Sequence, residues 1–129
     1  MKQQILQNKY PIFSIEIKKT DCVLVNMKEI LSFLRTKIDT HPVAQFIEYF
    51  DHFDHTNKIK NGEISTKIID AKIVIFCFGK KLDNPLQLAV RPRSIGIAET
   101  NEKFIISFMD APNPMFNEVM EKWIKSLIK

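Results

Sequence analysis

The first regular pattern in the chain is an alternation of apolar and polar residues over positions 11–18. Phe13, Ile15 and Ile17 fall on one side of this segment, and the polar residues between them fall on the other. Successive side chains of a strand point to opposite faces of a sheet. The pattern therefore predicts a strand with one buried face and one solvated face.

Two later segments repeat apolar residues every three or four positions, which is the spacing of one helix face. The first segment follows Asn26 and contains Met27, Ile30, Leu31, Leu34 and Ile38. The second follows Asn113 and Pro114 and contains Phe116, Val119, Met120, Trp123, Ile124 and Leu127. Asparagine is a favoured N-cap, and proline suits the first helical position. Both patterns therefore predict amphipathic helices.

Residues 43–55 fit both periodicities. A helix would gather a set of large apolar side chains on one side, namely Val43, Phe46, Ile47, Phe50 and Phe53. The high density of aromatic and β-branched residues favours a strand instead. In this segment the periodicity favours a helix and the composition favours a strand.

The remaining apolar segments are predicted to be strands. Residues 71–78 are almost continuously apolar, which is typical of a central strand. Residues 94–100 and 103–109 predict a hairpin. If residues 43–55 form a strand, the order of elements is β-α-β-β-β-β-α. We then expect a single α+β domain over residues 1–129, in which two helices cover one face of an antiparallel sheet of about five strands.

Composition and charge narrow the class of protein further. The chain has 129 residues, and its 19 basic and 15 acidic side chains give a net charge of +4. The basic residues are scattered, so we expect no nucleic-acid surface. The longest apolar run, residues 73–78, is far shorter than the roughly 20 residues of a membrane helix. Cys22 and Cys77 have no neighbouring cysteine, as is usual for reduced thiols. We therefore expect a cytoplasmic protein with no membrane association.

Three segments carry a resemblance to a known family, namely Phe50 to His52, residues 75–85 and residues 94–110. Their order resembles a widespread prokaryotic domain of unknown function, in which one strand ends in Asp-His and another runs into Phe-Gly-Asn-Pro before a hairpin. The resemblance implies a curved sheet covered by helices, similar to the TATA-binding-protein group, and a strand at residues 43–55. It implies no activity. Lys80 to Asp83 separate Gly79 from Asn84 in this chain, which indicates a separate small bacterial family that is distantly related.

The densest polar cluster runs from Asp51 to His55. Imidazole titrates near neutral pH and ligates metals, and a neighbouring carboxylate can fix its tautomer. On a strand, His52 and His55 would point to opposite faces and could not bind one ion together, whereas on a helix they could. The alternatives are a hydrogen-bonded histidine at a strand end, a metal or haem ligand, and an acid–base or ligand-binding His52 with Asp51 beside it.

Arg91 and Arg93 form the second candidate site. Guanidinium groups bind carboxylate or phosphate through paired hydrogen bonds, and Pro92 between them favours an extended backbone. The two arginines are either surface charges or an anion site. The chain has only three glycines and contains no glycine-rich phosphate loop and no serine nucleophile motif. We therefore predict no cofactor.

The sequence favours a non-enzymatic domain that binds or senses a small ligand with anionic and apolar parts. The ligand is expected in a groove between the sheet and the C-terminal helix. The candidate ligand-binding residues are His52, Asp51, Arg91, Arg93, Phe50 and Trp123. One alternative is an interaction module that forms a homodimer through an exposed strand edge or a Phe-rich face. A second alternative is an enzyme with His52 as its general base. No catalytic or metal-binding residue is assigned.

Overall fold

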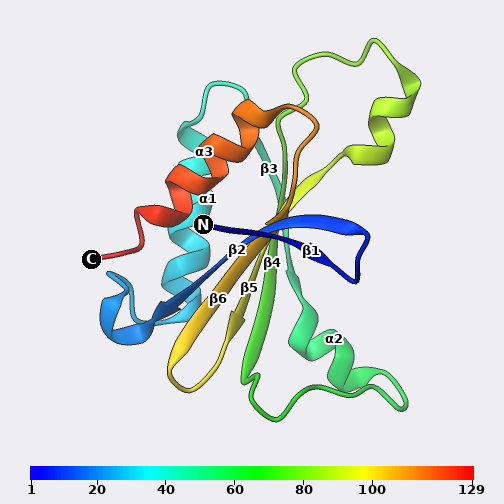
Figure 1. Ribbon diagram of the computed structural model, residues 1–129. Helices are drawn as coiled ribbons and strands as arrows, with labels where there is room; N and C mark the ends of the chain where they lie inside the picture. Colours follow the sequence, from blue (N-terminus) through cyan, green and yellow to red (C-terminus); the bar gives the residue numbers. More distant parts are fainter.

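Six strands pair antiparallel in one sheet, in the order β1-β2-β6-β5-β4-β3. The computed structural model describes residues 1–129 (Figure 1). Its strands are β1 (Lys2–Leu6), β2 (Tyr10–Lys18), β3 (Gln45–Asp51), β4 (Asp70–Cys77), β5 (Arg93–Glu99) and β6 (Lys103–Met109). Its helices are α1 (Met27–Thr40), α2 (His52–Lys58) and α3 (Pro114–Lys125), with 3₁₀ turns η1 (Lys19–Asp21) and η2 (Pro85–Val90). The predicted α+β class is confirmed, with six strands in place of about five.

The two long helices begin where the sequence predicts. The Asn26 side chain accepts a hydrogen bond from the amide of Glu29 at 2.9 Å. The Asn113 side chain accepts one from the amide of Met115 at 3.0 Å. Because each helix has one apolar side, α1 and α3 lie together on one face of the sheet (Figure 1). No helix combines the length and the apolar character that a membrane span requires.

The core lies between these helices and the face of the sheet that they cover. Alternate residues of the central strands point into it, because the side-chain period of a strand is two. These residues are Val74, Phe76, Ile95, Ile97, Phe104 and Ile106, and none is more than 2% exposed. The helices contribute the fully buried side chains of Ile30, Leu34, Ile38, Met120 and Ile124, and Leu127 just after α3 is fully buried as well. The remaining strand residues point to the opposite face, which we call the open face.

The segment over residues 43–55 divides between the two structures that its sequence allows. The strand prediction is correct from Gln45 to Asp51. Residues 43 and 44 precede the strand, and residues 52–55 are helical. The cause is local, because the Asp51 carboxylate accepts a hydrogen bond from the amide of Asp54 at 2.9 Å and so caps a new helix. The predicted order of elements therefore omits α2.

The predicted order also omits β1, which is an edge strand. β1 pairs with β2 from Lys2 to Leu6 and is joined to it by a turn in which Gln7 and Asn8 have φ of 53° and 59°. Most of its side chains are exposed. A strand at the edge of a sheet is held largely by its backbone hydrogen bonds, so it needs no alternation of apolar residues. This explains why the sequence pattern does not reveal it.

A buried amide fixes the connection between β6 and α3. Asn117 is the one buried polar residue of the chain. Its side-chain oxygen accepts a hydrogen bond from the amide of Ala111 at 2.8 Å, and its nitrogen donates to the Asp110 carboxylate. Buried polar groups need such partners, because an unsatisfied one costs about 1–3 kcal/mol. The contact holds residues 110–113 against the start of α3.

We predict that Ile30→Ala destabilises the fold by about 2–5 kcal/mol, because it leaves a cavity beneath α1. Ile30 is fully buried, whereas Ile5 on β1 is 59% exposed. The matched control, Ile5→Ala, is expected to change the free energy of unfolding by no more than about 0.5 kcal/mol. Denaturant unfolding measures both values. Equal losses for the two variants would contradict the placement of the core on the α1 side.

Candidate functional site

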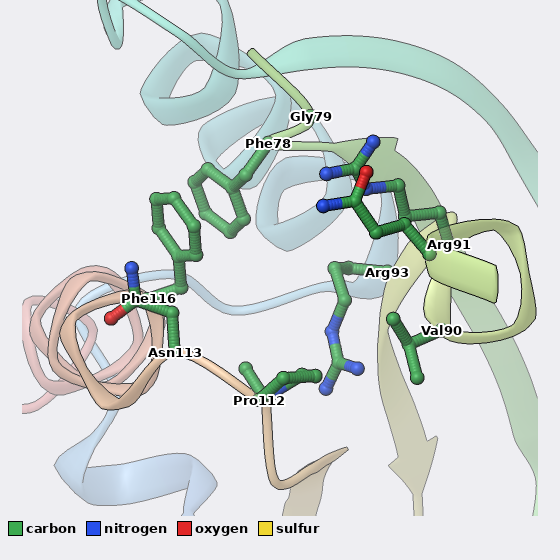
Figure 2. A pocket seen from close by; sticks show the side chains of 10 residues that line it. Phe78, Gly79, Val90, Arg91, Arg93, Pro112, Asn113 and Phe116 are labelled. Carbon is green, nitrogen blue, oxygen red and sulfur yellow. The ribbon is translucent and has the colours of Figure 1, made fainter. Parts of the chain in front are cut away.

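A cavity of about 260 Å³ opens between the end of the sheet and the beginning of α3. We call it the arginine cavity. Its lining residues are Phe78, Gly79, Gln87, Val90, Arg91, Arg93, Ala111, Pro112, Asn113 and Phe116. Figure 2 shows the two phenylalanine rings on one side and the two arginines on the other. The arginines are the only charged residues that line it, so an anion is the complementary ligand.

Arg93 is placed by the register of the sheet. Arg93 pairs with the core residue Phe76 on β4, and it precedes the core residue Ile95 by two positions on β5. Its side chain therefore lies on the same face as theirs, which the helices cover. Its guanidinium donates to the carbonyl of Met109. Its Nε is buried and has no hydrogen-bond partner. Partial burial lowers the pKa of the Arg93 guanidinium, and the nearby Asp110 carboxylate opposes this effect. An arginine nevertheless stays charged at neutral pH.

Arg91 approaches the cavity from the segment that precedes β5. Its Nη1 donates to the carbonyl of Lys81 at 2.8 Å. A Cβ atom on Gly79 would stand 3.0 Å from the Arg91 guanidinium carbon, so the lack of a side chain at Gly79 allows this close approach. Neither Arg91 nor Arg93 has a carboxylate oxygen within 4.0 Å. Neither cation therefore forms a direct ion pair within the chain, and Asp110 acts on Arg93 only from a greater distance.

The apolar wall of the cavity is a stack of aromatic rings. Phe78 and Phe116 stack with centroids 4.3 Å apart and an interplanar angle of 6°. Trp123 packs behind Phe78 at 5.7 Å and is itself buried. The His41 ring forms T-shaped contacts with both Phe78 and Trp123. The stack gives the cavity a fixed, flat surface, against which an apolar or aromatic group can lie.

The N-terminus of α3 adds a second source of positive potential. Asn113, the N-cap, lines the cavity, and Pro114 occupies the first helical position. The aligned peptide dipoles of a helix place a partial positive charge at this end. The twelve-residue α3 therefore supports the two arginines in favouring an anion.

The sheet does not bring His52 to the arginines. Arg93 pairs with Phe76, which also pairs with Phe46 near the start of β3, whereas His52 follows the end of β3. The step of six residues from Phe46 to His52 spans roughly 20 Å at about 3.3 Å per residue. Of the six predicted site residues, Arg91 and Arg93 line the arginine cavity, and Trp123 supports its wall. Phe50, Asp51 and His52 lie near the opposite end of the sheet.

Asp51 and His52 are engaged with different partners. The Asp51 carboxylate binds the amide of Asp54 at 2.9 Å and the ammonium of Lys72 at 3.1 Å. His52 Nδ1 lies 3.0 Å from the hydroxyl of Thr56. The carboxylate is thus occupied as a helix cap and in an ion pair, and no hydrogen bond joins it to the imidazole.

Helix α2 also brings two histidines together. The His52 and His55 rings stand 5.9 Å apart, and the Phe50 ring lies within 5.6 Å of each. No group of three histidine, cysteine, aspartate or glutamate side chains in the structure has the arrangement of a metal site. The arrangement around α2 is a small aromatic cluster on the surface.

Two parts of the cavity could not be identified from the sequence. Phe116 and Asn113 are recognisable as parts of a predicted helix, but nothing in their pattern shows that they meet Arg93. That meeting depends on the register of β4 and β5 and on the Asn117 contact that fixes the start of α3. The only part of this cavity that the sequence indicated was the pair of arginines on either side of Pro92.

The chain matches, over residues 1–129, a family of unknown function, DUF6858. Among solved structures it is similar to the crystal structure of an uncharacterized conserved DUF302 protein from Bacillus stearothermophilus, with 14% sequence identity and a TM-score of 0.60. The similarity covers 90% of this chain and 95% of that one. No curated protein matches the chain. The structural similarity concerns the fold alone, and the expected relation to a domain family of unknown function is confirmed.

We predict that the carboxyl of Asp51 has a pKa below its ordinary value of 3.8, because the folded chain binds its charged form. The hydrogen bond from the Asp54 amide lowers the pKa most, and Lys72 lowers it further. The resulting stability is present above pH 3.8 and is lost as the pH falls through the lower pKa of the folded state.

Carboxyl-resolved NMR titration measures this pKa directly. Asp51→Asn is the matched variant, since asparagine is also a good N-cap but does not titrate. The difference in stability between the two proteins should shrink as the pH falls below 3.8. A pKa of 3.8 or above for Asp51 would contradict the capping contact.

Proposed function

We propose that this chain, which belongs to the DUF6858 family of unknown function, binds a small anion with an apolar part in the arginine cavity. The proposal rests on the burial of Arg93 and on the lack of partners for its guanidinium group. The Arg93 guanidinium is partly buried, and it forms no direct ion pair. Its Nε is buried and has no hydrogen-bond acceptor. A buried donor without an acceptor costs about 1–3 kcal/mol. A ligand carboxylate or phosphate oxygen would supply the missing acceptor and the missing charge.

The second arginine supports the same chemistry. Arg91 and Arg93 line one cavity and present planar forks of N–H donors, which match the oxygens of carboxylate and phosphate. Charge-assisted hydrogen bonds of this kind are worth about 1.5–3 kcal/mol each. Two such residues that converge on one space, with the N-terminus of α3 beside them, favour an anion over a neutral ligand.

The volume of the cavity and its aromatic wall indicate the size and the apolar character of the rest of the ligand. Its volume of about 260 Å³ is slightly below the roughly 300–1,000 Å³ of sites for drug-sized molecules. Phe78 and Phe116 form a flat apolar surface opposite the arginines. A compact molecule that joins an acidic group to a short apolar or aromatic body fits both features.

The chemistry of the lining favours binding over catalysis. The ten lining residues include no aspartate, glutamate, histidine, cysteine, serine, threonine, tyrosine or lysine. The usual general bases and nucleophiles of enzymes are drawn from these types. A ligand in this cavity would be held and oriented without meeting a reactive side chain, as expected for a binding or sensing domain.

We predict that small aromatic carboxylates stabilise the protein. Benzoate is the simplest probe, and benzyl alcohol is its neutral counterpart of similar shape. A panel of small carboxylates and phosphates that includes benzoate should raise the melting temperature, because a ligand that binds only the folded state shifts the equilibrium toward it. Benzyl alcohol should have little effect. Thermal unfolding measures the melting temperature, and calorimetric titration measures the affinity for each compound.

The variants Arg91→Met and Arg93→Met should each weaken binding by about 10–100-fold, which corresponds to the loss of one charge-assisted hydrogen bond. Arg35→Met is the matched control, because Arg35 lies on the exposed side of α1 in an ion pair with Asp39. The proposal is wrong if no member of the panel raises the melting temperature, or if the rise persists in both cavity variants.

A further inference from the structure

The segment between β4 and β5 carries an unusual surface, which we call the arm and define as residues 80–92. It projects from the sheet on the side away from α1 and α3 (Figure 1). Its 3₁₀ turn, η2, contains no buried residue. Leu82, Leu86, Leu88 and Val90 are 64%, 78%, 60% and 42% exposed. Exposed apolar side chains are normal when they occur singly, whereas here four of them lie within nine consecutive residues of an exposed segment.

The arm is ordered by polar contacts. The Asn84 side chain accepts a hydrogen bond from the amide of Leu86 at 2.9 Å, and Gln87 donates to Asp83 at 3.0 Å. Arg91 donates to the carbonyl of Lys81 at the base of the arm. These hydrogen bonds fix the backbone while the leucines face solvent. The arm therefore presents its apolar side chains in a defined arrangement.

The open face of the sheet is the second uncovered apolar surface. It has a hollow of about 360 Å³, which we call the open-face hollow. Its floor includes Ala71, Ile73, Gly96, Ala98, Ile105 and Ser107. Its walls are α2 and residues 63–68. The floor is low because Gly96, Ala98 and Ser107 are small. A branched apolar side chain from outside would find both depth and apolar contact there.

We propose that a second copy of this chain covers the open face, with the arm of each copy seated in the open-face hollow of the other. The arm stands at the end of the sheet where β5 begins, and the hollow lies toward the end where α2 begins. A two-fold axis that lies along the open face and across the strands exchanges these two ends. Each contact is then made twice, as an isologous interface requires.

Unpaired charges on the two surfaces support a second copy of the chain as the partner. Lys80 and Lys81, at the base of the arm, have no carboxylate within 4.0 Å. Glu63, in the wall of the hollow, has no cation within that distance. In the proposed dimer the arm of one copy enters the hollow of the other, which brings Lys80 and Lys81 to the end of the interface where Glu63 of the other copy lies. Opposite charges that meet in this way steer and orient association.

A second copy accounts for both uncovered surfaces together. A small molecule in the hollow would leave the arm leucines in water, and pairing through the edge strand β1 or β3 would cover neither the arm nor the hollow. The proposal does not depend on a ligand in the arginine cavity. The arm contributes Gln87, Val90 and Arg91 to the lining of that cavity, whereas Leu86 and Leu88 are absent from it. Variants of the two leucines therefore test the dimer without changing the lining of the arginine cavity.

Two variants disrupt the interface from opposite sides. Leu86→Ser combined with Leu88→Ser removes the apolar contact of the arm, and both positions are exposed, so the fold should be unaffected. Gly96→Val fills the hollow. A Cβ atom at Gly96 would have its nearest neighbours, two atoms of Ser107, 3.9 Å away, so the strand accepts a side chain there. Val25→Ser is the matched control, because Val25 is 70% exposed and lies before α1, outside both surfaces.

Sedimentation or light scattering over a concentration series measures the dimer, and circular dichroism confirms that each variant is folded. We expect the wild type and Val25→Ser to dimerise alike. Each interface variant should dimerise more weakly, on the order of 100-fold for the double arm variant. A mixture of the arm variant with the hollow variant should form a tighter heterodimer than either variant forms alone, because one arm and one hollow in that pair are unaltered.

Tighter association in the mixture is expected only if the arm of each copy binds the hollow of the other. A wild type that stays monomeric at every concentration overturns the proposal. So does a dimer that neither variant weakens, or a mixture that associates no better than its components. Native mass spectrometry adds a direct check, since a monomer that carries a bound small molecule, with no dimer present, also overturns it.

Discussion

The burial of a single face of the sheet by both long helices is the constraint on which the rest of the structure depends. α1 and α3 place their apolar stripes on the same side, and the central strands supply alternate large side chains to meet them. The core is therefore thick on one side of the sheet. Its border at the start of α3 is where Arg93 lies, partly buried, and where the arginine cavity opens. The other side of the sheet has a hollow, whose floor is low where Gly96, Ala98 and Ser107 lie.

The parts of the fold that follow from local rules could be predicted from the sequence. Asn26 and Asn113 are N-caps that act within one helical turn, so the helices were placed correctly. The hairpin of β5 and β6 follows from two apolar segments with a short connection. β1 could not be found, because an edge strand is held by its pairing with β2 and has no apolar pattern of its own. α2 was missed because the capping role of Asp51 was outweighed by the aromatic content of the preceding strand.

The candidate site was only partly predictable, for a reason that lies in tertiary structure. The arginine pair is a local signal that guanidinium chemistry makes recognisable. The partners of the pair come from the end of β4 and from α3, and only the register of the sheet brings them together. His52 seemed a suitable third member because of its chemistry, but the direction of β3 places it at the other end of the sheet. Residue types indicated the chemistry, and strand direction decided which residues meet.

The claim that Arg93 awaits an anionic partner can be tested most directly at its own nitrogen. NMR spectra that resolve the Nε–H groups of Arg35, Arg91 and Arg93 can be recorded while benzoate is added. We predict that the Arg93 signal moves downfield and reaches saturation as its Nε gains an acceptor, while the Arg35 signal stays in place. If the three signals move together in proportion to salt, or if the Arg93 signal does not move, the account of this cavity as an anion site is contradicted.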